Sequence, residues 1–267
     1  MQDSLSSAGF TAISDFFFQH SGIRLKREKY ALVEGRLRRR ATAQGLDTLD
    51  EYVDHVLAAP QSAEALGVVD ALTTNETYFL REPAHFEHLT QVAREASGSR
   101  PLRVWSAAAS SGEEGYSIAM TLARHAGSHP WEVVGTDLSS VVVAKARQGL
   151  YPAERCTNIP LPDLKLWCLR GEGRYEGQVL INRELRSKVK FEIGNLMHPM
   201  PSLGQFDVIF LRNVLIYFEG EAKARLISNV LSHLRPGGHF YIGHTESLHG
   251  MEHMLQRIAP AIFRRPA

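Results

Sequence analysis

Cysteine and long apolar runs are scarce in this sequence of 267 residues. Its two cysteines, Cys156 and Cys168, are too few for a disulfide framework and lack metal-ligand spacing, so we expect two reduced thiols. No apolar run approaches the ~20 residues that cross a bilayer, and the start, MQDSLSSAGF, lacks the charged head and apolar core of a signal peptide. These absences predict a cytoplasmic protein without membrane insertion.

A large excess of charge is also missing. The formal net charge of +1 and the pI of about 7.9 argue against a surface built as a whole to neutralise phosphates. We therefore expect no nucleic-acid partner, and any basic function must be regional. A hydrophobic content of 44% is ample for a buried core, and we expect a globular monomer.

The first third of the chain has helical patterns and few β-branched alternations. Gly22, Gly45 and Pro60 lie at plausible helix ends, and the hydroxyl of Thr48 can cap a helix start. We expect a helical domain over residues 1–90, linker included, with helices within 13–22, 26–45, 48–60 and 61–76.

After residue 90 the pattern changes to short apolar runs that alternate with helix-like stretches. Runs rich in Val, Ile, Phe and Trp occupy 102–107, 131–137, 188–195 and 206–213, and a tight turn at Pro236 leads into a late strand near 239–248. Helix-like stretches at 114–127 and 139–149 separate the first three runs. This alternation predicts an α/β class, with a Rossmann-like parallel sheet in residues 91–267.

One interval breaks this rhythm. About 40 residues separate Gln148 from the strand at Lys188, which is too long for a plain loop in a compact domain. Within it, GEGRYEGQVLINREL combines a Gly-rich turn with strand-like alternation. We expect a small antiparallel β-subdomain inserted at 151–187.

The first strand-loop-helix unit of the sheet, RVWSAAASSGEEGYSIAM, indicates the ligand. It lacks the GxGxxG that brings a backbone against a pyrophosphate, and Glu113 and Glu114 would repel one. S-adenosylmethionine carries an ammonium and a sulfonium, which an acidic loop attracts. Asp137, at the end of the next strand, is placed to accept from both ribose hydroxyls, and Asn195 and Leu196 follow the third strand, where they can edge and cover adenine.

Structural alternatives exist for each of these residues. An Asp at a strand end can simply cap the following helix, and Glu113 and Glu114 suit a helix N-terminus through the macrodipole. The cofactor interpretation depends on finding these residues together, in order, on one sheet.

Four long motifs carry a resemblance to a known family. They are TTNETYFLRE (73–82), RVWSAAASSGEEGYSIAM, FDVIFLRNVLIYF (206–218) and LRPGGHFYIGHTESL. Over nearly its whole length the chain resembles the bacterial chemotaxis receptor methyltransferases, the CheR family. The resemblance implies transfer of methyl from S-adenosylmethionine to glutamate γ-carboxylates on chemoreceptor signalling helices, which gives glutamate methyl esters and S-adenosylhomocysteine.

The resemblance also implies site residues. Tyr217 matches a tyrosine near the transferable methyl, and Arg81 is a candidate to pair with the cofactor carboxylate or to orient the incoming glutamate. Leu80, Gly115 and Leu211 stand where other residues are common, which bears on local packing. The implied cofactor contacts are Asn75, Thr77, Arg81, Glu114, Asp137, Asn195, Leu196, Arg212 and Asn213.

The chemistry needs no catalytic base. A glutamate side chain has an unperturbed pKa of about 4.3 and is already ionised at neutral pH. The enzyme must align a carboxylate oxygen with the methyl group and exclude water. The lack of a nucleophilic Cys or a Ser-His-Asp arrangement fits this reaction. The alternatives are a structural ion pair for Arg81 or Arg212 and a core aromatic role for Tyr217.

Two further features concern partners. On a helix from Tyr30 to Ala43, Arg36, Arg39 and Arg40 form a basic stripe that we expect to dock acidic receptor helices, although such stripes are often only solvated. The segment from Gly171 to Gly177 resembles a family loop that pairs with a receptor C-terminal pentapeptide by strand addition, the alternative being an ordinary hairpin turn.

We predict no metal site. His249 and His253 have metal-pair spacing but no evident third ligand. Two rival functions remain at this point: a methyltransferase with another acceptor, and a catalytically silent protein that senses the cofactor or scaffolds receptors.

Overall fold

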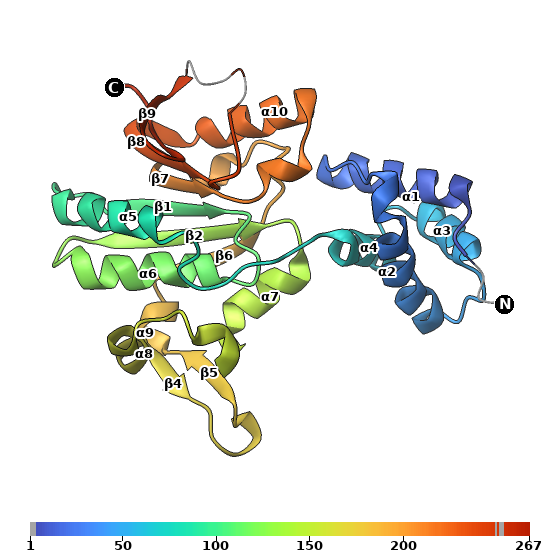
Figure 1. Ribbon diagram of the computed structural model, residues 1–267, viewed down its shortest axis with the longest axis horizontal. Coiled ribbons are helices and arrows are strands. Elements are labelled where there is room, and N and C mark those ends of the chain that lie inside the picture. Colours follow the sequence, from blue (N-terminus) through green and yellow to red (C-terminus); the bar gives the residue numbers. More distant parts are fainter. Residues whose placement is uncertain (1–3, 249, 251–253) are drawn as a thin grey trace. The chain divides into compact units, whose positions relative to one another are not determined.

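A computed structural model of the chain describes residues 4–248, 250 and 254–267. The chain divides into two compact units, residues 1–74 and residues 75–267. Figure 1 shows both units, and each has buried apolar side chains of its own.

The first unit is a small helical bundle. Its elements are α1 (Ser7–Ser21), η1 (Arg27–Lys29), α2 (Tyr30–Ala43), α3 (Leu49–Ala58) and α4 (Ala63–Leu72). The hydroxyl of Thr48 accepts from the Glu51 N–H and the Glu51 carboxylate accepts from the Thr48 N–H, a capping box that fixes the start of α3. Gly22 ends α1 with φ of 73°. The Thr48 cap and the helices expected within 26–45, 48–60 and 61–76 are confirmed, whereas α1 begins at Ser7, capped by Ser6, six residues before the expected start.

The second unit is built on a seven-stranded sheet. In spatial order the strands are β6 (Val189–Ile193), β2 (Trp131–Asp137), β1 (Leu102–Ala107), β7 (Phe206–Leu211), β8 (Leu234–Ile242), β10 (Ile262–Arg264) and β9 (Gln256–Ala259). The first five pair in parallel, and β10 and β9 add on antiparallel. Chain order reverses direction between β1 and β7, so the ligand crevice of such a sheet lies at the carboxyl ends of these strands.

Helices connect and cover these strands. They are α5 (Pro83–Glu95), α6 (Glu113–His125), α7 (Ser140–Gln148), α8 (Leu161–Trp167), α9 (Arg183–Arg186) and α10 (Gly220–Leu231). Helix α6 packs on β1 and β2, and α7 packs on β2 and β6, which is visible in Figure 1. The expected α/β class and parallel sheet are confirmed, whereas the short β9 and β10 were not predicted.

The interval after α7 folds as a separate small sheet. Its strands, in spatial order, are β3 (Leu150–Pro152), β5 (Gln178–Ile181) and β4 (Cys168–Arg170), paired antiparallel. Turns η2 (Ala153–Cys156) and η3 (Gly173–Tyr175) complete it, while η4 (Pro201–Leu203) and η5 (Leu215–Tyr217) belong to the main sheet's loops. The antiparallel insert is confirmed. Its strand-like run stops at Ile181, because Asn182 accepts from the Leu185 N–H and starts α9.

The boundary between the two units differs from the expected one. The chain divides after Thr74 rather than near residue 90, because α5 belongs to the second unit. Phe86 and Leu89 of α5 are buried in the same cluster as the β1 residue Val104. Helical periodicity reports an apolar face but not the core into which that face packs.

Two of the predictions made from composition concern the cysteines and membrane-spanning segments. Cys156 and Cys168 are free thiols, and burial raises their pKa values to about 11 and about 12. In the part of the chain that the structure describes, no helix combines the length and apolarity of a membrane span.

Candidate active site

The segments that follow four strands, β1, β2, β6 and β7, meet at one edge of the sheet. Ala107 of β1 is in register with Thr136 of β2 and Leu211 of β7, and Asp137 of β2 is in register with Ile193 of β6. The residues that directly follow these strands therefore share one edge of the sheet. Asp137 ends β2, and four more of the predicted cofactor residues follow β6 and β7: Asn195, Leu196, Arg212 and Asn213.

The backbone at this edge is strained. Outside glycine, positive φ angles occur among the described residues at Leu80, Glu82, Ala108, Ser110, Asn213 and Ala261. All except Ala261 lie before α5 or directly after β1 and β7. Each such residue costs of order 1 kcal/mol or more, so the surrounding contacts must hold these loops in place. Strain of this kind concentrates at binding sites.

Asp137 joins two of the loops. One carboxylate oxygen accepts from the Ser110 N–H at 2.8 Å, and the other accepts from the Ser139 N–H at 3.0 Å. Ser139 in turn caps α7. The structural alternative for Asp137 is thus present, and the carboxylate also lies beside the loop after β1.

Arg212 lies between two carboxylates. Its guanidinium is 3.0 Å from Glu114 and 3.1 Å from Glu82, donates to the carbonyl of Arg81, and its side chain is only 2% exposed. Ser106 donates to Glu114 at 2.6 Å. Two largely buried carboxylates, 16% and 14% exposed, therefore share a single guanidinium. Burial raises the pKa of Glu114, the negative charge of Glu82 raises it further, and Arg212 and Ser106 oppose this.

This arrangement corrects the sequence-based view of the acidic loop. Glu113 is 0% exposed, lies 2.5 Å from Arg155 of the insert and accepts from Ser111, so its charge is neutralised within the protein. Glu114 instead shares Arg212 with Glu82, so any spare negative charge comes from this pair. Arg212 is engaged with these carboxylates, so it acts as a structural ion pair in addition to any contact with a ligand.

The segment before α5 lies against the loop after β1. Ser110 donates to the carbonyl of Asn75 at 3.0 Å, and Arg155 donates to the carbonyl of Thr77 at 2.7 Å. Arg81 is half-buried, donates to the carbonyl of Glu76 and lies over the Tyr78 ring. The structure therefore brings Asn75, Thr77 and Arg81 to the same edge as Asp137.

The remaining predicted residues follow β6 and β7. Asn195 accepts from the Met197 N–H at 3.0 Å, and Leu196 is buried. Asn213 adopts φ of 58° and its side-chain amide donates to Glu82 at 3.3 Å. Tyr217 is half-buried at the end of η5. All of them lie in loops at the carboxyl edge.

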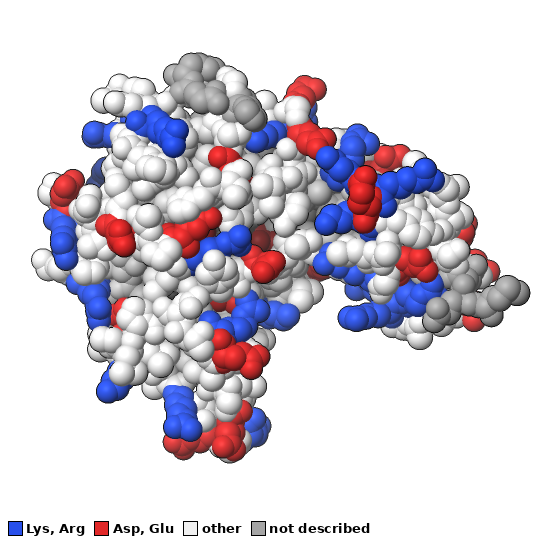
Figure 2. Space-filling view, viewed as in Figure 1, with Lys and Arg blue, Asp and Glu red and all other residues white. Residues whose placement is uncertain are grey.

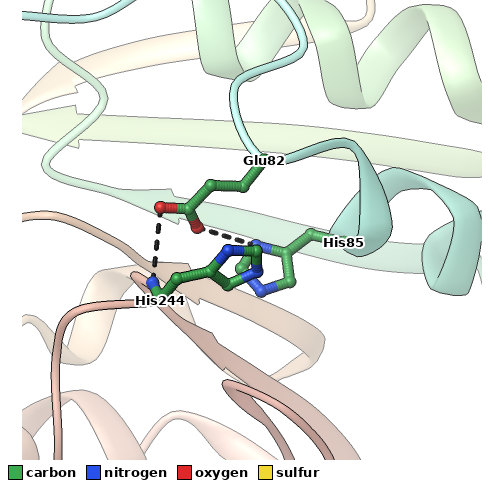
Figure 3. Close-up of side chains that lie close together, drawn as sticks. All are labelled: Glu82, His85 and His244. Carbon is green, nitrogen blue, oxygen red and sulfur yellow. Dashed lines mark hydrogen bonds and ion pairs between the residues drawn. The ribbon is translucent and has the colours of Figure 1, made fainter.

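Sequence reasoning missed three residues of the site, which Figure 3 shows together with their contacts. Glu82 accepts from the His244 N–H at 3.3 Å, and its other oxygen lies 3.4 Å from the buried ring of His85. Burial and the charge of Arg212 lower the pKa of His85 to about 3, so this ring is neutral. The three side chains have the composition of a metal site. Glu82 already has Arg212 as its cation, so we interpret the cluster as an ion-pair centre that joins α5, β7 and β8.

Glu246 was also missed, although it lies within the HTES motif. Its carboxylate accepts from the backbone N–H groups of Asn213, Leu215 and Gly243. The sequence predicted a strand near 239–248 that includes Glu246, whereas β8 ends at Ile242 and Glu246 lies in the loop after it. Such a residue is commonly exposed, so composition and spacing do not single it out.

The basic stripe of the first unit is mostly engaged inside that unit. Arg36 donates to the carbonyls of Leu72 and Thr73 at the end of α4, and Arg40 pairs with Glu64 at 2.9 Å. Arg39 is exposed. Figure 2 shows further Lys and Arg side chains on the surface of this unit, interspersed with acidic ones. Arg39 is thus the exposed member of the predicted stripe, and receptor docking by Arg36, Arg39 and Arg40 stays a prediction.

The glycines of the insert have structural reasons of their own. A Cβ on Gly171 would lie 2.0 Å from the Tyr175 carbonyl oxygen, and Gly173 and Gly177 have φ of 57° and 77°. The loop therefore requires glycine whether or not a peptide binds. His249 and His253 lie outside the described residues.

The charges and donors at the sheet edge fit S-adenosylmethionine. The cluster of Glu82, Arg212 and Glu114 holds two carboxyl groups and one guanidinium, so with Glu114 ionised it carries one spare negative charge, which suits a ligand with an ammonium and a sulfonium. Asp137 offers carboxylate oxygens to hydroxyls, and Leu196 offers an apolar surface. The fold and this edge of the sheet define the class of protein: it is an S-adenosylmethionine-dependent methyltransferase.

Comparison with known proteins names the family. Residues 8–73 match the all-alpha domain of CheR methyltransferases, and residues 75–262 match their SAM binding domain. The chain is 39% identical to a chemotaxis protein methyltransferase 2 of Pseudomonas aeruginosa, over 95% of this chain and 91% of that protein. It is 40% identical to the chemotaxis protein methyltransferase of Salmonella typhimurium, over 91% of this chain and 85% of that protein. The chain belongs to the CheR family of chemotaxis methyltransferases.

The solved structures that resemble this chain have lower sequence identity to it. The N-methyltransferase NodS of Bradyrhizobium japonicum, in complex with S-adenosyl-l-homocysteine, is 16% identical, with a TM-score of 0.41 over 70% of this chain and 88% of that chain.

Proposed function

We propose that this methyltransferase esterifies glutamate γ-carboxylates on chemoreceptor signalling helices. The observation that carries the proposal is the joint presence of a cofactor edge with excess negative charge and of family motifs that match along both units. The relatives at 39% and 40% identity are named chemotaxis protein methyltransferases. A chemoreceptor acceptor fits those names.

We assign the predicted residues to the cofactor as follows. The carboxylate of Asp137 accepts from the ribose hydroxyls, and Glu114 attracts the ammonium group. Leu196 covers the adenine. S-adenosylmethionine supplies an electrophilic methyl group on a sulfonium. The other contacts come from Asn75, Thr77, Arg81, Asn195, Arg212 and Asn213.

The protein's own contribution to the transfer is positioning. A substrate glutamate is ionised at neutral pH, so no side chain has to take a proton. We assign Arg81 to the orientation of the incoming carboxylate, since a guanidinium forms bidentate contacts with carboxylates. Tyr217 donates a hydrogen bond beside the methyl. The loops around them exclude water and hold the reacting atoms in line.

Receptor docking is assigned to one face of α2. Leu32, Gly35, Arg39 and Thr42 are all exposed and are spaced three or four residues apart, so they form one row. A Cβ on Gly35 would meet no atom within 4 Å, so packing within the unit does not require this glycine. A small residue beside Leu32 and Arg39 allows an acidic amphipathic helix to approach closely.

A second contact is assigned to the insert. Strand β4 lies at the edge of the small sheet, and Leu169 on it is 54% exposed. An extended receptor C-terminal pentapeptide fits as an added strand there, next to the Gly171 to Gly177 loop. Calorimetry with such peptides tests this, with Leu169→Asp as the disruptive variant. Leu166→Asp on α8, also at an exposed leucine, is the matched control. If titration with every receptor peptide gives no heat of binding, the contact is refuted.

Transfer of a tritiated methyl group tests the function itself. The purified chain, labelled S-adenosylmethionine and receptor signalling fragments are expected to give protein-bound label that mild alkali releases as methanol, because carboxyl esters hydrolyse in base. A label stable to base would assign the chain to another acceptor. Binding of cofactor with no transfer to any receptor would favour a silent sensor.

A further inference from the structure

The turn after β7 carries much of the assigned chemistry. It begins with Arg212 and Asn213 and ends with Tyr217 in η5. Asn213 has φ of 58°, a conformation that residues with a side chain avoid, and an isolated turn would leave it. Contacts from elsewhere must therefore hold this turn in shape.

Glu246 supplies those contacts. One carboxylate oxygen accepts from the Asn213 N–H at 2.8 Å and from the Gly243 N–H at 2.6 Å, and the other accepts from the Leu215 N–H at 2.7 Å. Three short hydrogen bonds to an anion are stronger than bonds between neutral groups. One side chain thus holds the strained turn at Asn213 and at Leu215, the first residue of η5.

Gly243 completes the cradle. It directly follows β8, whose last residue, Ile242, is in register with Leu211 of β7. A Cβ on Gly243 would lie 2.4 Å from the Asn213 side-chain nitrogen and 2.8 Å from a Glu246 oxygen. Only glycine lets Asn213 approach this closely. Glu82 holds the Asn213 amide from the opposite segment at 3.3 Å.

We propose that Glu246 is a positioning residue for methyl transfer, which presents Asn213 to the cofactor and Tyr217 to the reacting methyl through the backbone of their shared turn. The proposal rests on the proposed assignment of these two residues. A carboxylate is required because all three partners are donors. Glutamine keeps one acceptor oxygen but turns an NH2 group toward an N–H group.

Cofactor affinity without any acceptor tests the proposal. Glu246→Gln is expected to weaken S-adenosylhomocysteine binding, measured by calorimetry, by about tenfold or more, because a small misplacement of a binding group has effects of this size. Glu221→Gln on α10 is the matched control, since the Glu221 side chain is 92% exposed, and its affinity should equal wild type. Thermal unfolding is recorded for both variants.

A double-mutant cycle separates positioning from general support of the fold. Asn213→Gly removes the amide and relieves the positive φ, so Glu246→Gln should weaken binding less in that background than in wild type. Wild-type affinity in Glu246→Gln, or equal losses in both backgrounds, would overturn the proposal. These readouts use no receptor, so failure of the proposed acceptor would appear separately, as absent methyl transfer by wild type.

Discussion

Glu114 is the residue at which fold stability and cofactor binding oppose each other. Burial raises its pKa, so in the free protein its ionised form is unfavourable. A carboxyl group with a raised folded pKa stabilises the fold at low pH, and this contribution is lost as pH rises through the folded pKa. Glu114→Gln should therefore not destabilise the free protein near pH 8, since Arg212 keeps Glu82 as its partner. Chemical denaturation at that pH measures this.

The same substitution, Glu114→Gln, should weaken the binding of the cofactor. The ionised carboxylate attracts the cofactor's ammonium, so affinity should fall as the pH is lowered toward the raised pKa. The fall begins at a higher pH than an ordinary carboxyl group near 4.5 would give. Calorimetric titration with S-adenosylhomocysteine from pH 8 to 5 is expected to show this slope in wild type and a flatter one in Glu114→Gln. Parallel slopes would mean that Glu114 does not contact the ammonium.

Arg212 is the cation that pairs with both Glu114 and Glu82. Arg212→Met leaves two buried carboxylates without a cation, and removal of one member of a buried pair costs about 3–5 kcal/mol. Denaturant unfolding measures the loss. Adding Glu114→Gln to Arg212→Met should recover part of the stability, because one of the two uncompensated charges is gone. No recovery in the double variant would show that the carboxylates act independently.

At the scale of elements, the insert is tied to the cofactor loops by η2. Arg155 pairs with the buried Glu113 and donates to the carbonyl of Thr77, and Tyr151 donates to the carbonyl of Ser111 at 2.7 Å. Arg155→Met should cost about 1–3 kcal/mol, because a buried acceptor loses its partner. The substitution should also weaken the binding of S-adenosylhomocysteine. Arg183→Met, an exposed arginine on α9, is the control that should change neither quantity.

Gly35 lies in the middle of α2, where glycine weakens a helix. Gly35→Ala should stabilise the protein by about 0.5–1 kcal/mol, since the added Cβ meets no atom and the helix gains propensity. If a receptor helix approaches this face, the same change should raise the KM for receptor methylation and leave cofactor affinity unchanged. An unchanged KM would show that this face of α2 does not take part in receptor docking.

The elements show what the sequence alone could predict. Apolar runs such as 131–137 and 206–211 are continuous because both faces of a parallel strand are buried, so β2 and β7 were expected at the right place. Strand ends then placed Asp137 and Arg212 at one edge. The assignment of α5 failed, because an amphipathic helix gives the same pattern on either core.

The finer contacts of the site could not be read from the sequence. Glu113 and Glu114 are adjacent and chemically identical, yet one pairs with Arg155 of the insert and the other with Arg212 after β7. Successive residues on a helix point about 100° apart, and only tertiary structure decides which of them meets the crevice. The same holds for Glu246, whose three partners come from two different loops.

At the scale of the whole molecule, the cofactor edge and the α2 row proposed for receptor docking lie in different units. Every contact described for the cofactor edge lies within residues 75–267, whereas the row on α2 lies within residues 1–74. The second unit has its own core, with Trp105, Phe206 and Tyr241 fully buried. We therefore expect residues 75–267 alone to bind S-adenosylhomocysteine with an affinity close to that of the full chain.

Receptor methylation should respond differently to the same truncation. Without α2, the cofactor unit keeps the residues assigned to the transfer but loses the exposed row with Arg39, so the KM for receptor fragments should rise strongly while cofactor affinity holds. Arg39→Glu in the full chain should reproduce part of this rise, and its effect should shrink at high salt, where charge interactions are screened. If the truncated unit methylates receptors with the KM of the full chain, docking is carried by the second unit, and the exposed edge of β4 becomes the surface to test next.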